Sequence, residues 1–193
     1  LLRGLTKWSE RINHPTEAGA VMAEAFRQLT SGRVRPVAVE APWNVFGMSA
    51  EVGPVTPLAP SPPPQPDAAS VAAAARMIAA ARRPLIMVGA GALGAADVVR
   101  ELATLLQAPV TAHRSGKGIV GEDSPYGMSA VAAWEYWREC DLLIGIGSRL
   151  ELQYLRWRWF PQQLRVVRVD IDPTEMVRLR PEIGIVTDAA LGT

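Results

Sequence analysis

The residues best suited to chemistry in this chain are three glycines, Gly89, Gly91 and Gly94, which follow the apolar residues 85–88. Between a strand and a helix, glycines at this spacing allow a tight turn, and the first free N–H groups of the helix then face a phosphate. One interpretation is therefore a nucleotide site. The other is that the glycines only let the strand and the helix pack closely.

The residues after the next expected strand argue against simple NAD binding. Such a site needs a carboxylate about 20 positions further on, for the ribose hydroxyls. This chain has Thr111-Ala112-His113-Arg114 there, with no carboxylate. Arg114 could favour the 2′-phosphate of NADP, but a single arginine is weak support for NADP binding. The glycines of residues 115–118 lack the Ser or Thr that completes a phosphate loop.

Polar residues follow two later strands at the edge where parallel sheets bind ligands. Arg149 comes after a third glycine turn, and it suits either a forked contact with an anion or an ordinary salt bridge. Asp170 ends the following strand and suits a ribose hydroxyl or an adenine amine. Asp172 precedes Pro173, with Glu175 two residues beyond the proline, which is a helix-capping signature.

The elements that must position these residues alternate between short apolar strands and helices. We expect strands at residues 84–89, 109–112, 141–147, 165–171 and 183–186. We expect helices at residues 95–107, 129–138 and 173–179. This alternation is typical of an α/β fold with a doubly wound parallel sheet, which is Rossmann-like.

The first third of the chain predicts a different unit. Pro15 starts a helix that Gly32 would close, and a short buried strand follows at residues 36–40. Seven prolines in residues 54–66 exclude a helix or an inner strand and predict an extended linker. The expected organisation is the tail of one α/β domain at residues 1–53, the linker at 54–66, and a second domain at 67–193. Asp67 is placed to cap the first helix of that domain.

Composition excludes several classes of function. With 49% apolar and 20% charged residues the chain is globular, and 20 basic against 19 acidic residues give no reason to expect nucleic acid or an anionic membrane as partner. The single Cys140 excludes an intramolecular disulfide and fits a cytoplasmic protein. His14 and His113 are too few for a metal site. The aromatic groups at residues 134–137 and 154–160 favour packing or an interface over base stacking. Because the chain starts at Leu1 rather than Met, we expect a fragment of a longer polypeptide.

These segments, in this order, resemble the thiamine diphosphate enzymes of the acetolactate synthase and benzoylformate decarboxylase type. The resemblance covers nearly the whole chain. Residues 1–53 resemble the C-terminal part of the family's pyrimidine-binding domain, and residues 67–193 resemble its central domain. The segments that carry it are 5–8, 35–42, 84–91, 109–111, 116–118, 126–128, 141–149 and 169–173.

The resemblance implies a parent enzyme that uses thiamine diphosphate and Mg²⁺ to decarboxylate a small 2-keto acid or to transfer its remaining carbons. In this family the cofactor supplies the electron sink. The glutamate that activates the cofactor and the Gly-Asp-Gly motif that holds the metal are absent from this chain. The fragment alone is therefore expected to be inactive, and the parent to be a homo-oligomer, a dimer or a tetramer.

The resemblance also implies a possible nucleotide on the central domain, which binds FAD or ADP in some members and nothing in others. This sequence departs from the synthases after Met128, where Ser129 begins a different turn, and after Arg149, where Leu150 follows. An empty structural domain is the favoured expectation, and a stand-alone adenine-nucleotide or regulatory module is the alternative. The residues that match nucleotide-contacting segments of the family are Gly89, Gly91, Thr111, Arg149, Asp170, Ile171, Asp172 and Asp188.

Overall fold

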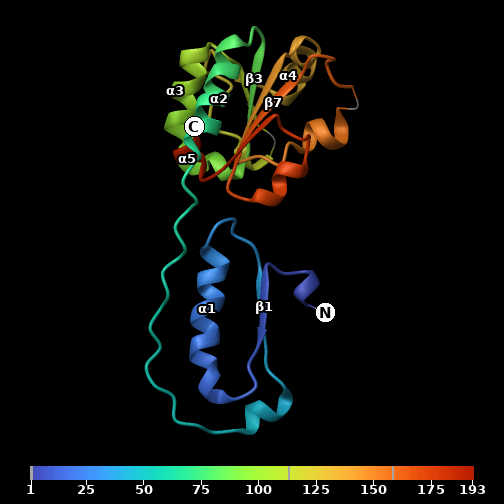
Figure 1. The fold of residues 1–193 in the computed structure, drawn as a ribbon. Helices are drawn as coiled ribbons and strands as arrows, with labels where there is room; N and C mark the ends of the chain where they lie inside the picture. The colour runs from blue at the N-terminus through green and yellow to red at the C-terminus, as the bar shows by residue number, and fades with distance from the viewer. Residues whose placement is uncertain (1, 113, 158) are drawn as a thin grey trace. The chain divides into compact units, whose positions relative to one another are not determined.

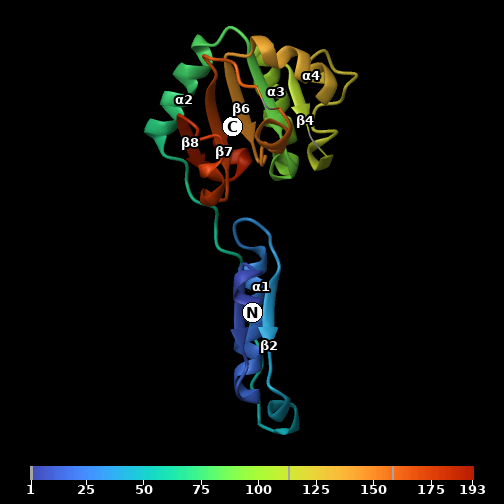
Figure 2. The same cartoon turned by 90° about the vertical axis from the view of Figure 1, so that its right-hand side faces the viewer.

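The computed structural model describes residues 2–112, 114–157 and 159–193 of the chain, so His113 and Arg158 lie outside the described residues. The chain forms two compact units, residues 1–63 and residues 64–193. Figure 1 shows both, and Figure 2 shows them from the side. Among the described residues, no helix is both long and apolar enough to cross a membrane.

The first unit is a pair of parallel strands, β1 (Trp8–Arg11) and β2 (Val37–Glu40), with helix α1 (Ala18–Thr30) between them in the sequence. Three short 3-10 turns complete it: η1 (Leu2–Gly4), η2 (Pro15–Glu17) and η3 (Trp43–Gly47). The predicted helix start is confirmed, because His14 Nδ1 accepts a hydrogen bond from the N–H of Thr16 at the cap of η2. β2 is only half-buried rather than buried, since its sheet has just two strands.

The proline-rich segment has no helix or strand from residue 48 to residue 67, as its composition predicts. It is not detached from the first unit. Val55 lies against Gly19 of α1, where a Cβ would stand 2.5 Å from the Val55 side chain. Near the end of α1, Ser31 Oγ accepts a hydrogen bond from the N–H of Ser61 at 2.9 Å, and Arg27 donates to Ser61 Oγ at 2.8 Å.

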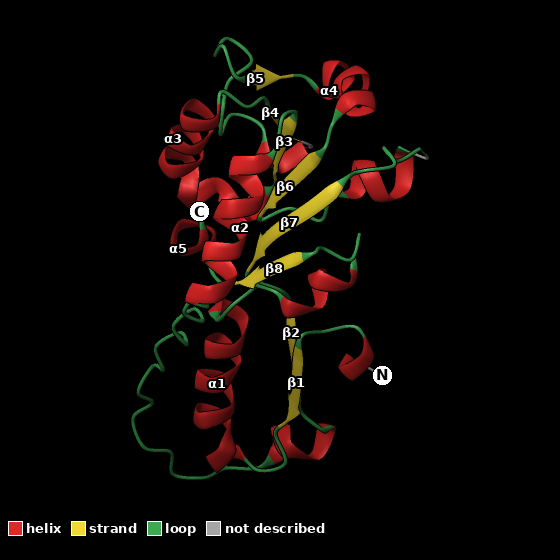
Figure 3. Cartoon of the chain, turned by 45° about the horizontal axis from the view of Figure 1, so that its top comes forward, coloured by secondary structure: helices red, strands yellow, loops and turns green. Residues whose placement is uncertain are grey.

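The second unit is a six-stranded sheet covered by helices on both faces (Figure 3). Its strands are β3 (Pro84–Val88), β4 (Val110–Ala112), β5 (Gly127–Met128), β6 (Leu142–Ile146), β7 (Arg165–Asp170) and β8 (Ile183–Val186). Its α-helices are α2 (Ala68–Ala80), α3 (Ala96–Leu106), α4 (Ala130–Tyr136) and α5 (Ala189–Gly192). The short turns are η4 (Ala90–Ala95), η5 (Arg114–Gly116), η6 (Trp137–Glu139), the π-helical η7 (Leu152–Arg156) and η8 (Pro173–Val177).

All pairs in this sheet are parallel, in the order β5-β4-β3-β6-β7-β8. The chain winds outward from β3 in both directions, so the reversal lies between β3 and β6. This confirms the predicted doubly wound α/β sheet and the five strands expected in it. The short β1 and β5 were not predicted. The helix expected at 173–179 is the 3-10 turn η8, and the predicted cap of α2 is confirmed, because Asp67 accepts from the N–H of Ser70 at 2.8 Å.

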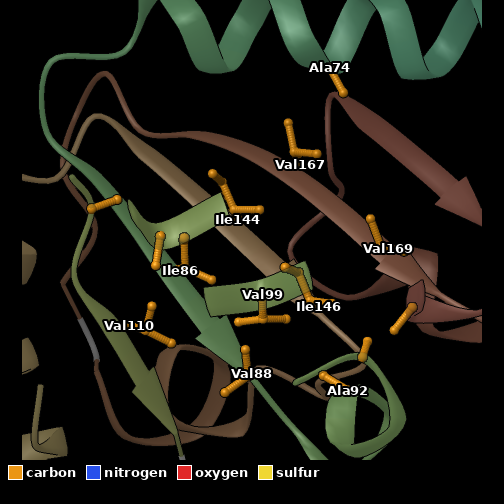
Figure 4. Close-up of a cluster of buried hydrophobic side chains, with 14 of the residues drawn as sticks. Ala74, Ile86, Val88, Ala92, Val99, Val110, Ile144, Ile146, Val167 and Val169 are labelled. Carbon is orange, nitrogen blue, oxygen red and sulfur yellow. The ribbon is translucent and has the colours of Figure 1, made fainter. Parts of the chain in front are cut away.

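The core lies in two layers, one on each face of the sheet. On the first face, strand side chains pack under α2, α3 and α5. Figure 4 shows Ala74 of α2, Ala92 of η4 and Val99 of α3 with the strand residues Ile86, Val88, Val110, Ile144, Ile146, Val167 and Val169. On the second face, alternate residues of the same strands pack under α4, η6 and η7, with Trp137 fully buried. Strands covered on both faces read as continuous apolar runs, which is why the sequence revealed them.

Candidate functional site

The glycine turn after β3 is filled by backbone from the turn after β6. The N–H of Gly91 donates to the carbonyl of Gly147 at 3.1 Å, and the N–H of Gly89 donates to Ile146 at 3.1 Å. A Cβ at Gly91 would stand 2.8 Å from Gly147 Cα, and a Cβ at Gly89 would stand 2.4 Å from Gly147 O. At the reversal point of the sheet, therefore, glycine packs on glycine, and the Gly91 N–H already has a protein acceptor.

A fourth glycine, Gly116, packs against the same turn from the other side. A Cβ at Gly116 would lie 2.6 Å from the carbonyl oxygen of Val88 and 3.0 Å from Gly89 Cα. The end of β3 is thus held between the glycines that follow its two neighbours in the sheet, β4 and β6. Close packing explains the glycines without a ligand, as the structural interpretation of the sequence requires.

Arg149 lies at the same edge, and its guanidinium faces carboxylates. Its Nη1 is 3.3 Å from Glu151 Oε1, and its Nε is 3.7 Å from Glu175 Oε1. About half of the Arg149 side chain is exposed. The contacts correspond to the salt-bridge interpretation of this residue rather than to a free anion-binding fork.

A buried arginine that the sequence interpretation missed organises this edge. Arg168 lies in the middle of β7, has 0% exposure, and donates to the backbone carbonyls of Ser148, Glu175 and Arg178. The carboxylates of Asp170 and Glu175 stand 3.8 and 3.9 Å from its Nη2. Arg168 thereby joins the turn after β6 to η8.

Both strands beside β7 carry a glycine opposite Arg168, and other side chains occupy the space above each glycine. Arg168 pairs in register with Gly145 of β6 and with Gly184 of β8. Leu150 covers Gly145, with side-chain atoms 3.1 Å from the place of a Cβ, and Met176 covers Gly184 at 2.9 Å. A charged residue in the middle of a strand that is covered on both faces must be paired, and that is the signal that could have identified it.

The remaining acidic residues of the expected site serve local structure. Asp172 caps η8 by accepting from the N–H and hydroxyl of Thr174, at 3.0 and 2.6 Å. Asp188 caps α5 by accepting from the N–H of Ala190 at 2.9 Å. Asp170 is buried and accepts from the N–H of Asp172 at 3.0 Å. Ile171, half-buried, lies between these two aspartates, one residue beyond the end of β7.

Thr111 differs from the other residues of the expected site. It belongs to β4, it is 1% exposed, and its hydroxyl has no hydrogen-bond partner among the described residues. It lines a cavity of about 210 Å³ at the end of β4, which we call the Thr111 cavity. The full lining is Val110, Thr111, Ala112, Lys117, Gly118, Val120, Gly121, Glu122 and Met128. A second buried polar group without a partner among the described residues is the amide of Gln153, in the π-helical turn η7.

The aromatic groups are mostly packed against each other. The rings of Trp134 and Trp137 lie 5.6 and 5.1 Å from Trp157, and Phe160 lies 5.8 Å from Trp137. Cys140 lies in the same layer, where burial raises the pKa of its thiol to about 12. A thiol with that pKa is not a nucleophile at neutral pH. The described residues also contain no group of three His, Cys, Asp or Glu side chains arranged for a metal ion.

Comparison with known proteins agrees with this fold. Residues 71–192 match the family described as thiamine pyrophosphate enzyme, central domain. The chain is 34% identical to the acetolactate synthase large subunit of Parasynechococcus marenigrum (strain WH8102), over 97% of this chain and 33% of that protein. It is 32% identical to the probable 2-ketoarginine decarboxylase AruI of Pseudomonas aeruginosa, over 88% of this chain and 31% of that protein.

A solved structure shares the fold. Benzoylformate decarboxylase from Polynucleobacter necessarius superposes with a TM-score of 0.80, at 21% identity, over 96% of this chain and 37% of that one. The chain spans about one third of the length of the curated relatives it matches. Because the family match covers most of the chain and nearly all of its six-stranded unit, the chain belongs to the thiamine pyrophosphate enzymes, as a carrier of their central domain.

Proposed function

We propose that the chain is part of an enzyme that uses thiamine diphosphate to decarboxylate a 2-keto acid or to transfer its remaining carbons to an acceptor. The observation that carries this proposal is the sequence match across 97% of the chain to an acetolactate synthase large subunit. Bound thiamine diphosphate supplies an electron sink for carbanion chemistry. The substrate is a small 2-keto acid, and the whole enzyme is a cytoplasmic homo-oligomer that also requires Mg²⁺.

The Gly-Asp-Gly motif that the family resemblance assigns to the metal beside the diphosphate does not occur in this chain. The role we propose for this chain is therefore architectural. Residues 1–53 act as the C-terminal part of the pyrimidine-binding domain, residues 54–66 as the linker, and residues 67–193 as the central domain. By this proposal the chain alone is inactive.

The residues of the second unit also fit an adenine nucleotide poorly, so we propose a central domain without FAD or ADP. Backbone atoms of Gly147 fill the space beside Gly89 and Gly91. Arg149 is paired with carboxylates. Asp172 and Asp188 each cap a helical turn. The same contacts weigh against a stand-alone adenine-nucleotide module.

Two experiments test this proposal. The whole enzyme that contains this chain should release CO₂ from 2-keto acids such as pyruvate only when thiamine diphosphate and Mg²⁺ are both present. Cofactor-independent turnover, or inactivity toward a panel of 2-keto acids, would contradict the assignment. Separately, FAD or ADP at millimolar concentration should leave the tryptophan fluorescence of the purified chain unchanged, whereas a saturable change would refute the domain without nucleotide.

A further inference from the structure

We propose that residues 150–157, which we call the η7 segment, form a lid that opens and closes while the rest of the second unit stays folded. This inference concerns the central domain alone and does not depend on the reaction proposed for the parent enzyme. Three observations on the described residues carry it: a leucine in the left-handed backbone region, a buried amide without a hydrogen-bond partner, and a π-helical turn, all in this one segment.

The first residue of the η7 segment has an unfavourable backbone conformation. Leu150 has a φ of +53°, which a bulky residue rarely adopts. Packing enforces it, because the Leu150 side chain is fully buried and lies 3.1 Å from the place that a Cβ of Gly145 would take. Backbone strain of this kind persists only where the surroundings enforce it, and it is typical of segments that switch. The closed position of the segment therefore carries a cost that an open position releases.

The middle of the η7 segment carries a second cost. Gln153 is 0% exposed, and neither its amide nitrogen nor its amide oxygen has a hydrogen-bond partner among the described residues. A buried amide without partners loses the hydrogen bonds that water gives it, and opening returns Gln153 to water. Together with the strain at Leu150, this shifts the equilibrium toward the open position by roughly a hundredfold.

The backbone of the η7 segment is irregular around Gln153. The N–H of Tyr154 donates to the carbonyl of Leu150 at 3.0 Å, as in an α-helix, whereas the N–H of Trp157 donates to the carbonyl of Leu152 at 2.7 Å, five residues back. Such a π-helical turn holds one extra residue, and turns of this kind are frequent at functional sites. Because the segment is no regular helix, packing must hold it closed.

Apolar side chains supply that packing. Leu150, Leu152 and Trp157 pack in the layer on the second face of the sheet. Between them Tyr154 is 57% exposed, and the Arg178 guanidinium of the neighbouring segment lies 5.9 Å from its ring centre, a weak contact at an exposed site. Opening must undo this packing, and it uncovers the second face of the sheet at the carboxyl end of β6, beside the reversal of strand order where ligands of such sheets bind.

Amide hydrogen exchange of the 193-residue chain, measured residue by residue by NMR, tests the lid. The N–H groups of Tyr154 and Trp157 are hydrogen-bonded in the closed lid and exchange when it opens. They should be at least about a hundredfold less protected than the amides of β6 and β7, and nearly insensitive to urea below the unfolding transition, because a local opening exposes little surface. Equal protection and equal urea dependence in the segment and the strands would overturn the lid.

Gln153→Met tests whether the buried amide favours opening, because it removes the amide and keeps the length of the side chain. It should slow the exchange of Tyr154 and Trp157 about tenfold, since the closed lid loses its unmet hydrogen-bonding groups. Gln163→Met is the matched control, because Gln163 is exposed, and it should leave the exchange unchanged. The proposal is overturned if the two variants behave alike or if Gln153→Met speeds the exchange.

Leu150→Ala tests whether packing over Gly145 holds the lid closed. It should speed the same exchange about thirtyfold or more, the effect of truncating a buried leucine. Leu155→Ala is the matched control in the same segment, because Leu155 is 61% exposed, and it should change the exchange less than about threefold. Equal effects of the two variants contradict the proposal. Circular dichroism confirms that each variant is folded, and the comparison within wild type needs no variant.

Discussion

Replacing Arg168 by Met should destabilise the second unit by about 3 kcal/mol. Removing one partner of a buried ion pair costs roughly 3–5 kcal/mol, because the other charge stays buried without compensation. Here the side chain of Glu175 is 3% exposed, and three backbone carbonyls lose their donor as well. Arg178 at 3.0 Å and Arg149 at 3.7 Å still neutralise Glu175, which places the cost at the lower end of that range.

Urea unfolding followed by far-ultraviolet circular dichroism measures this change. At a slope of about 2 kcal/mol per molar urea, a loss of about 3 kcal/mol lowers the midpoint by about 1.5 M. Arg165→Met is the matched control on the same strand, since Arg165 pairs with Glu182 at 3.0 Å and both side chains are about half exposed. Such a surface pair contributes about 0–1 kcal/mol. If the two variants unfold at the same urea concentration, Arg168 does not hold this edge together.

Three further outcomes are expected. Gly147→Ala should cost at least about 2 kcal/mol in a thermal melt, because its Cβ would lie 2.4 Å from Gly91 C and its φ is +53°, whereas Gly94→Ala, with open space around it, should change stability by under about 1 kcal/mol. Hydrogen bonds from Arg27 and Gln28 lower the pKa of Glu24 from 4.5 to about 2. The stability advantage of wild type over Glu24→Gln should therefore be complete above pH 4.5 and vanish as the pH falls to about 2, and a constant difference in acid titrations would contradict it. Cys140 is buried and its thiol has a raised pKa, so it should resist iodoacetamide in the native chain and react fully in urea. Mass spectrometry counts the labelled chains, and rapid labelling of the native chain would contradict the burial of Cys140.

The sequence predicted the strands of the second unit well because burial on both faces leaves a local signature. Residues 85–88 and 142–146 contain no polar side chain; Pro84 and Gly89 bound the first run, and Asp141 and Gly147 bound the second. β1 was missed because its four residues, Trp-Ser-Glu-Arg, are half-exposed and become a strand only by pairing with β2. β5 has two residues and exists only beside β4.

Site residues were harder to interpret because one residue type serves both ligand binding and packing. The spacing of Gly89 and Gly91 placed a turn correctly, but only the structure shows that Gly147 fills the space above it. Glu151, one partner of Arg149, lies only two residues further along the chain, but the other partner, Glu175, belongs to η8, and no local pattern connects it to Arg149. Thr111 belongs to the expected nucleotide site only through the family resemblance. Its buried hydroxyl has no hydrogen-bond partner among the described residues, and only the structure shows this.

Because the proline-rich segment packs on α1, a chain cut within this segment should stay associated. Residues 36–75 contain no Lys or Arg, so trypsin has no site between the two units and should leave them covalently joined. A protease specific for glutamate can instead cleave after the exposed Glu51. Residues 52–63 would then belong to the second fragment while Val55 still rests on Gly19 and Ser61 still bonds to Ser31. A chain nicked at this point should therefore migrate as one species in native gels and separate into two only in denaturant.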